Sequence, residues 1–192
     1  EFTLRLPNGQ EHLVSSQLIG EHHVHNLLAA ATIAYNAGIA GDRIAHALNT
    51  SGAVSKWRMA RTDRADGVTV INDAYNANPE SMRASLVTFA ELQVEGKMAI
   101  LGEMREMGRE TLRYHRELEP LLNGLQSVVL VGDAWRSAVP ERPGLAFVRD
   151  WGEALEIAEG TSWTGLLVKG SNSLGLQNVV RGLVAERGGA AS

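Results

Sequence analysis

The chain has 192 residues, 44% of them hydrophobic and 21% charged, which suits a globular protein with one full domain and a smaller part. The net charge is −4 and the 18 lysines and arginines are scattered, so neither a nucleic-acid surface nor a lipid-binding surface is indicated. Cysteine is absent, which excludes disulfides and thiolate metal sites; without a signal peptide or an apolar run of roughly 20 residues, the sequence predicts a cytoplasmic protein with no membrane span.

The first 55 residues predict a hairpin followed by two helices. Residues 2–15 alternate apolar and polar side chains around the turn at residues 7–9. A helix is expected over 22–37 with Gly38 as its C-terminal cap, and a shorter one over 42–48 with Asp42 as its N-cap. An isolated hairpin is only marginally stable and the chain begins without Met, so we expect this part to be the end of a larger domain. The aperiodic residues 49–57 predict a domain boundary.

From residue 56 onward, short apolar runs alternate with helical segments. The runs lie at 68–71, 98–101, 128–131, 145–148 and 166–168. The helical segments lie at about 79–93, 110–122, 133–138, 151–159 and 174–187. This alternation predicts an α/β fold with a Rossmann-like, mostly parallel sheet and crossover helices. The small residues 188–192 predict a disordered tail.

Polar residues follow several of these runs, where ligands of open α/β sheets bind. Two of the pairs, residues 132–133 and 149–150, fit ordinary turn and helix-cap chemistry. Residues 72–73 and 169–171 are harder to explain in that way. Lys169 at a strand end, followed by Gly and Ser where a helix begins, predicts an anion site.

The segment INDAYNANPESM, residues 71–82, divides into a structural and a candidate ligand-binding part. Asn78, Pro79 and Glu80 suit an N-cap, a first helical position and the helix dipole. Asp73, Tyr75 and Asn76 are then left on the loop between strand and helix. An aspartate in that place can accept hydrogen bonds from ribose hydroxyls, so nucleotide binding is one hypothesis among others for this loop.

Five segments in order resemble the Mur ligase family. They are GEHHVHN at 20–26, WRM at 57–59, VINDAYNANPESMRASL at 70–86, LGEMREMG at 101–108 with His115 downstream, and LVKGS at 167–171. Within the family, the motifs DAYNANP and KGS resemble those of the members that join D-alanyl-D-alanine to UDP-N-acetylmuramoyl-tripeptide in peptidoglycan synthesis.

The resemblance implies an ATP-dependent ligase that activates a carboxylate as an acyl phosphate. It implies that residues 1–55 are the C-terminal end of a central ATP-binding domain and that 56–187 form the family's C-terminal domain. The sequence contains no G-x-x-x-x-G-K-[ST] phosphate loop, so we expect these 192 residues to be inactive alone. We expect a monomer, with Mg²⁺ bound mainly by central-domain residues outside this sequence.

The resemblance also assigns candidate site residues. Those toward the nucleotide are Asn26 near adenine, Arg58 toward ATP, Asp73 at the ribose, and Tyr75, Asn76 and His23 beside them. His23 stands where the family usually has Asn, which puts that contact in doubt. His22 and Lys169 are the candidate catalytic residues.

The substrate-binding candidates for D-alanyl-D-alanine are Glu103, Arg105, Lys169 and Ser171. Glu103 stands where many relatives have Asp, and it and Arg105 are equally well explained as solvated loop charges. For His115 a structural hydrogen bond is expected rather than proton transfer. The cluster of His22, His23 and His25 suggests a metal site, but no carboxylate or cysteine completes it, and none is expected in this chain.

Three alternatives remain open from the sequence. The chain could belong to another Mur ligase or to a ligase similar to folylpolyglutamate synthase, since both share the architecture and the ATP chemistry. It could also be a non-catalytic nucleotide-binding module.

Overall fold

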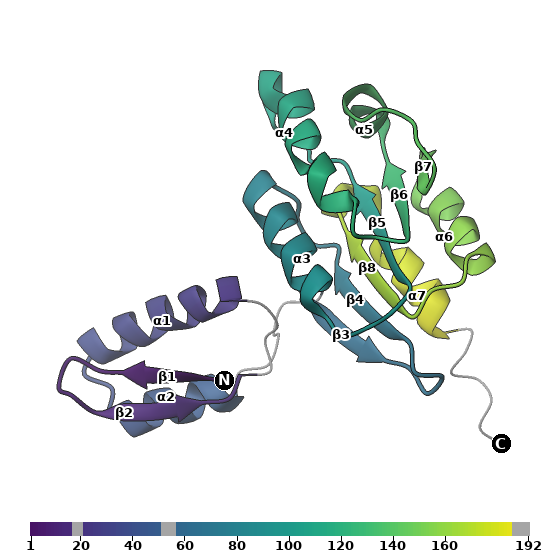
Figure 1. Cartoon of the computed structure of the whole chain (residues 1–192). Helices are drawn as coiled ribbons and strands as arrows, with labels where there is room; N and C mark the ends of the chain where they lie inside the picture. Colours follow the sequence, from purple (N-terminus) through teal and green to yellow (C-terminus); the bar gives the residue numbers. More distant parts are fainter. Residues whose placement is uncertain (17–20, 51–56, 186–192) are drawn as a thin grey trace. The chain divides into compact units, whose positions relative to one another are not determined.

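The computed structural model describes residues 1–16, 21–50 and 57–185, and the chain forms two compact units, residues 1–55 and 56–192 (Figure 1). The predicted disordered tail at 188–192 and most of the predicted boundary at 49–57 lie outside the described residues. Within the described ranges, no helix is both long enough and apolar enough to cross a membrane.

The first unit contains the predicted hairpin and two helices. Strands β1 (Phe2–Arg5) and β2 (Glu11–Val14) pair antiparallel, and α1 (Glu21–Asn36) and α2 (Gly41–Thr50) follow. Gly38, at a φ of +81°, ends α1 by donating to the Tyr35 carbonyl, as predicted. The core of this unit consists of Leu4, Leu6, Val14, Leu27, Ala31, Ile44, Ala45 and Leu48.

The prediction that Asp42 caps the second helix is wrong. The helix already begins at Gly41, and the amide of Ile44 bonds to the carbonyl of Ala40. Asp42 therefore lies inside the first turn, where its charge still favours the helix dipole. The close approach of the hairpin explains the glycine, because a Cβ at Gly41 would lie 2.4 Å from the Leu6 side chain.

The second unit is built on a mixed sheet whose strand order is β3-β4-β8-β5-β6-β7. Five strands are parallel and match the predicted apolar runs: β4 (Thr69–Asp73), β5 (Lys97–Gly102), β6 (Ser127–Val131), β7 (Leu145–Val148) and β8 (Gly165–Lys169). The sequence did not predict β3 (Ala60–Asp63), an antiparallel edge strand with mostly exposed side chains. Its pairing is by backbone, so it leaves no hydrophobic pattern.

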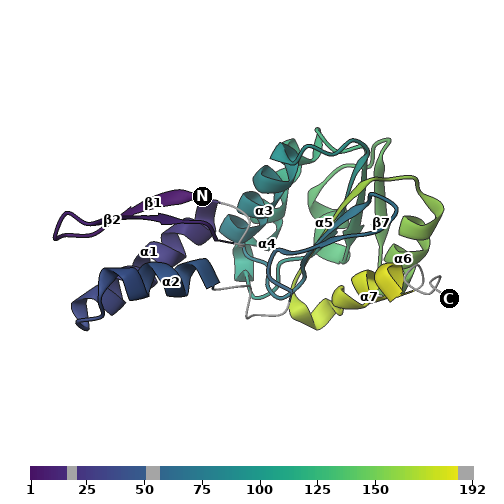
Figure 2. The same ribbon diagram turned by 90° about the horizontal axis from the view of Figure 1, so that it is seen from below.

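Helices cover both faces of the sheet. Helices α3 (Pro79–Glu91), α4 (Thr111–Leu118) and α5 (Asp133–Ala138) cover one face, and α6 (Trp151–Gly160) and α7 (Gln177–Ala185) cover the other (Figures 1 and 2). The core beneath α6 and α7 includes Met98 and Ile100 of β5 and Leu166 and Val168 of β8. Near-continuous apolar strands are expected when both faces are buried.

Two predicted helices are shorter than expected. The segment at 110–122 is α4 flanked by 3-10 turns at 108–110 and 119–122, because Pro120 lacks the N–H that would continue the helix. The segment at 174–187 begins with a 3-10 turn over 172–174, which Gly175 ends at a φ of +67° before α7 starts.

The connections place a switch point in the middle of the sheet. Strand β8 lies between β4 and β5, but its helix α7 covers the opposite face from α3 and α4, which follow β4 and β5. The loops after these three strands therefore diverge to opposite faces at the carboxyl edge. Ligands of open α/β sheets bind at such a crevice.

Candidate functional site

The loop after β4 is shaped by the start of α3. Asn78 is the N-cap: its side chain accepts from the amide of Ser81, and the Ser81 hydroxyl accepts from the amide of Asn78. With Pro79 at the first helical position, this capping box fixes where the helix begins, as the sequence predicts. Residues 74–77 therefore form a short turn across the carboxyl edge of the sheet.

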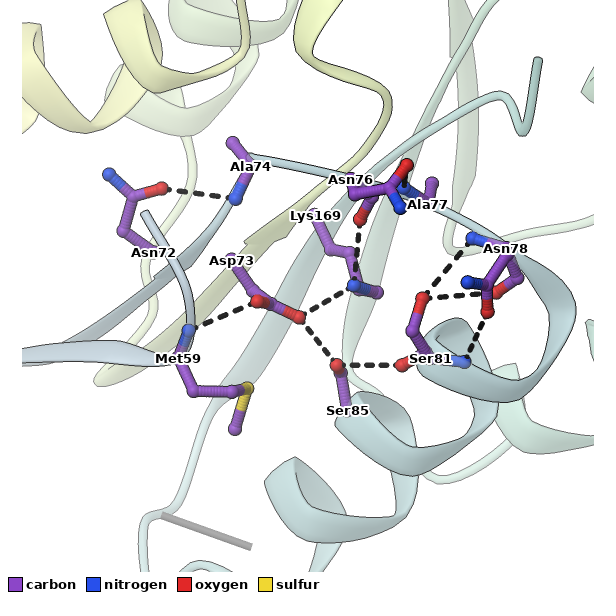
Figure 3. A network of polar contacts seen from close by, with 10 residues as sticks. All are labelled: Met59, Asn72, Asp73, Ala74, Asn76, Ala77, Asn78, Ser81, Ser85 and Lys169. Atoms are coloured by element: carbon purple, nitrogen blue, oxygen red, sulfur yellow. Dashed lines mark hydrogen bonds and ion pairs between the residues drawn. The ribbon is translucent and has the colours of Figure 1, made fainter. Parts of the chain in front are cut away.

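Asp73 is the centre of a buried polar network (Figure 3). It is the last residue of β4 rather than a loop residue, and its side chain is buried. Its Oδ1 accepts from the amide of Met59 at 3.0 Å. Its Oδ2 accepts from Lys169 Nζ and from Ser85 Oγ, each at 2.6 Å. Both carboxylate oxygens are thus engaged within the protein.

Lys169 faces this carboxylate from the neighbouring strand. Its side chain is 2% exposed, and its ammonium donates to Asp73 and, at 2.9 Å, to the carbonyl of Asn76. Burial lowers the pKa of Lys169, while the Asp73 carboxylate opposes that shift. The predicted anion site at this lysine is, in this structure, an internal ion pair that ties β8 to the turn after β4.

Backbone strain is concentrated just before β3. Trp57 and Met59 have φ values of +65° and +48°, a left-handed conformation that costs a non-glycine residue about 1–3 kcal/mol. Among the described residues, the Tyr75 amide donates to the Trp57 carbonyl at 3.2 Å and the Met59 amide donates to Asp73, and both bonds hold this segment. The buried Met59 side chain anchors it further.

Arg58 lies between the two strained residues and is exposed. Its guanidinium carbon is 4.4 Å from the centre of the Tyr75 ring, which is 43% exposed. This contact places a cation and an aromatic face at the carboxyl end of β4, and a guanidinium fork suits anionic oxygens. The exposed Asn76 is beside them in the turn, with its side-chain oxygen accepting from the amide of Ala77.

A second polar cluster joins the ends of β5 and β8. The hydroxyl of Ser171 donates to the carbonyl of Glu103 and accepts from the amide of Arg105. The Arg105 guanidinium contacts Glu103 at 3.2 Å and Ser173 at 3.0 Å. The half-buried Glu103 also accepts from the amide of Ala134 at the start of α5. The structure thus brings together Glu103, Arg105 and Ser171, as the sequence predicts, and adds Ser173.

His115 holds the loop of this cluster through the amide of Met104, which lies between Glu103 and Arg105 in the chain. It is fully buried, accepts from the amide of Met104 through Nε2 at 2.9 Å, and has Nδ1 2.6 Å from the Thr111 carbonyl. These partners require a neutral ring protonated on Nδ1. Burial lowers the pKa of His115, opposed by the Thr111 bond and the charge of Glu103. The structural hydrogen bond predicted for this histidine is present.

The remaining candidate residues belong to the first unit. Asn26 and His25 are exposed on α1, and His23 is half-buried in its first turn. The side chain of His22 lies outside the described residues. In the parts of the chain that the structure describes, no group of three histidine or acidic side chains could hold a metal ion.

The sequence profile described as Mur ligase, glutamate ligase domain, matches residues 57–172. The chain belongs to the Mur ligase family. Among curated relatives, the UDP-N-acetylmuramoyl-tripeptide--D-alanyl-D-alanine ligase of Mycobacterium tuberculosis is 35% identical over 96% of this chain, and that of Escherichia coli is 32% identical over 95%. A crystal structure of MurF from Acinetobacter baumannii is 27% identical with a TM-score of 0.83 over 96% of the chain.

The chain spans about two fifths of the length of these Mur ligases: 42% of the M. tuberculosis relative, 41% of the E. coli relative and 42% of the A. baumannii structure. The predicted fold is confirmed by both the profile and the structural match. Sequence reasoning did not single out Ser85 or the backbone amide of Met59, which bind Asp73. The sequence could not identify Ser85 as a partner of Asp73, because the packing of α3 against β4 decides which group its hydroxyl contacts.

Proposed function

We propose that this chain is part of an ATP-dependent ligase that adds D-alanyl-D-alanine to UDP-N-acetylmuramoyl-tripeptide. The observation that carries the proposal is the 35% identity to such a ligase over 96% of the chain. In this reaction, ATP phosphorylates the tripeptide carboxylate, and the amine of the dipeptide then displaces phosphate from the acyl phosphate. Residues 1–55 would belong to the central ATP-binding domain and 56–187 would form the C-terminal domain.

On the nucleotide side, the proposed contacts are Arg58, Tyr75 and Asn76. All three are exposed at the carboxyl edge of β4, and the guanidinium of Arg58 is suited to phosphate oxygens. Asp73 is the proposed ribose partner, although both its oxygens already have internal donors. Asn26 and His23 are the proposed adenine contacts from the first unit.

On the amine side, the proposed contacts come from the loops after β5 and β8. Arg105 has an exposed guanidinium that suits the carboxylate of D-alanyl-D-alanine, with Glu103 and Ser171 fixing its loop. Lys169 is 2% exposed and would act through Asp73 rather than by touching the dipeptide. His22 stays a candidate without a described side chain, and we assign the Mg²⁺ ligands to none of the described residues.

The test is an assay of the protein encoded by the full coding sequence. With ATP, Mg²⁺, UDP-N-acetylmuramoyl-tripeptide and D-alanyl-D-alanine, we expect phosphate release that depends on both peptides. Replacing D-alanyl-D-alanine by single amino acids tests the alternative Mur ligase activities, and folate with glutamate tests the folylpolyglutamate alternative. We expect the 192-residue chain alone to release no phosphate. Activity with another amine in preference to the dipeptide would overturn the substrate assignment.

A further inference from the structure

The backbone conformation of Trp57–Met59 is intrinsically unfavourable and depends on contacts with the rest of the unit. Two of its three residues have positive φ values, which are unfavourable for L-amino acids. Interactions with neighbouring residues must therefore stabilise this conformation. The residue between them, Arg58, is an exposed cation beside the carboxyl end of β4. The position of its guanidinium thus depends on what fixes the backbone on either side.

The hydrogen bond on the C-terminal side goes to Asp73. The amide of Met59 donates to Oδ1 of that carboxylate at 3.0 Å, so a rotation of the carboxylate would release the amide. The orientation of the carboxylate is set by its other oxygen, which accepts from two buried donors, Lys169 and Ser85 (Figure 3). Lys169 in turn holds the Asn76 carbonyl on the far side of the turn.

Ser85 connects this carboxylate to α3. It is 1% exposed, and its hydroxyl lies 2.6 Å from Asp73 Oδ2 and 2.8 Å from the Ser81 carbonyl one turn earlier. Ser81 is itself the partner of Asn78 in the capping box. The hydroxyl has one proton, which the shorter contact assigns to Asp73 Oδ2. Ser85 therefore links α3, whose start the capping box fixes, to the carboxylate that holds the strained segment.

We propose that Ser85 is a positioning residue that, through Asp73, holds Trp57–Met59 and thereby aims Arg58 at the phosphates of the nucleotide. The direction toward phosphate rests on the proposed function; the holding of the segment does not. Ser85 is too deeply buried to touch a ligand, so its effect passes through Arg58. Loss of the hydroxyl should raise the KM for ATP by about tenfold and change kcat less. The reason is that the Arg58 guanidinium would be displaced from the phosphates when ATP binds, before the chemical step.

The chain offers a matched control on the same strand. Thr69, at the opposite end of β4, also has a buried side chain whose hydroxyl donates to an aspartate, Asp63, at 2.7 Å. Thr69→Val removes that bond without changing the side-chain shape. It therefore reproduces the loss of a hydroxyl–carboxylate bond without affecting the network around Asp73.

The first measurement is amide hydrogen exchange in the 192-residue chain by NMR. In Ser85→Ala we expect the Met59 amide to exchange at least about tenfold faster and the ring-current shift of the Arg58 side chain to decrease, while amides of β5 and β6 stay protected. Thr69→Val should leave Met59 and Arg58 unchanged. Unaltered Met59 exchange in Ser85→Ala, or equal acceleration in both variants, overturns the positioning role whatever the protein catalyses.

The second measurement is the KM for ATP of the full-length ligase carrying each variant. A rise in Ser85→Ala but not in Thr69→Val supports the link to the phosphates. An unchanged KM, in an active ligase whose Met59 amide has lost protection, overturns that link. If the unsubstituted ligase shows no ATP-dependent activity, the proposed function fails, and the exchange measurement still decides whether Ser85 positions the segment.

Discussion

Asp73 and Lys169 are 96 positions apart in the chain, and they are register partners on the parallel strands β4 and β8. The sequence identified both as polar residues at strand ends and predicted that both face a ligand. It could not show that the two strands are neighbours, and so it could not predict that the two charges neutralise each other. Beside the end of β4, Arg58, Tyr75 and Asn76 are exposed.

Replacing Arg58 by Ala tests its proposed contact with the nucleotide. We expect a KM for ATP at least about tenfold higher in the full-length ligase, since a charge-assisted bond to phosphate is lost. The matched control is Arg61→Ala, three residues later on β3, where an exposed arginine pairs with Asp63 instead. Its KM should stay at the unsubstituted value, and equal effects of the two changes would argue against a specific role for Arg58.

The buried pair can be tested by a double-variant cycle in urea. Lys169→Met leaves the Asp73 carboxylate without its counter-charge, and Asp73→Asn leaves the Lys169 ammonium buried without one. Each should lower the free energy of unfolding by about 3–5 kcal/mol. The double variant removes both charges, so it should be more stable than the sum of the two changes predicts. Strictly additive costs would mean that the two charges are not coupled.

His115 predicts a dependence of stability on pH. Burial lowers the pKa of its ring in the folded protein, whereas in the unfolded chain it is about 6.5. Between the two values the unfolded chain binds a proton that the folded protein does not, so stability is complete above the unfolded pKa and is lost as pH falls toward the folded one. This slope reaches about 1.4 kcal/mol per pH unit.

Urea unfolding of the unsubstituted chain and of His115→Asn, followed from pH 8 to pH 5, isolates this contribution. Carboxylates titrate equally in both proteins, so the difference between the slopes belongs to His115. We expect the unsubstituted chain to lose stability faster below pH 6.5 than the variant does. Parallel curves would mean that the ring titrates normally in the folded protein.

At the scale of elements, the sequence predicted the buried strands of the second unit and missed its exposed edge strand. Runs of Val, Ile and Leu located β4, β5, β6 and β8 because both faces of those strands are covered, and a shorter apolar run located the half-buried β7. The edge strand β3 exposes its side chains and was missed. The order of the strands could not be predicted from the sequence either. Strand β8 lies between β4 and β5, and such long-range pairing does not affect the local hydrophobic periodicity.

The insertion of β8 between β4 and β5 brings Gly102 and Gly170 into contact and leaves little room for a Cβ on either of them. A Cβ on Gly102, at the end of β5, would lie 2.6 Å from the Leu174 side chain and 3.1 Å from the Cα of Gly170 after β8. Gly102→Ala should therefore lower the free energy of unfolding by about 1–3 kcal/mol. Gly124→Ala is the control, since nothing lies within 4 Å of its added Cβ. Urea unfolding that gives equal costs for both would refute this packing argument.

At the scale of the whole molecule, the chain forms two compact units, and each contains a described hydrophobic cluster of its own. The described core of the first unit uses residues between Leu4 and Leu48, and that beneath α6 and α7 in the second uses residues between Val70 and Leu183. Neither set contains a residue of the other unit. Each core can therefore be weakened without removing a side chain from the other.

Substitution of one isoleucine in each core tests whether the units unfold independently. Ile44 in α2 is 3% exposed and Ile100 in β5 is fully buried, so Ile→Ala at either should cost about 2–5 kcal/mol in its own unit. Hydrogen exchange followed by mass spectrometry should then show faster exchange in residues 1–50 for Ile44→Ala and in residues 57–185 for Ile100→Ala, each with the other unit unchanged. If Ile44→Ala accelerated exchange in β5 and β6 as much as in α2, the two cores would unfold as one cooperative structure despite sharing no described side chain.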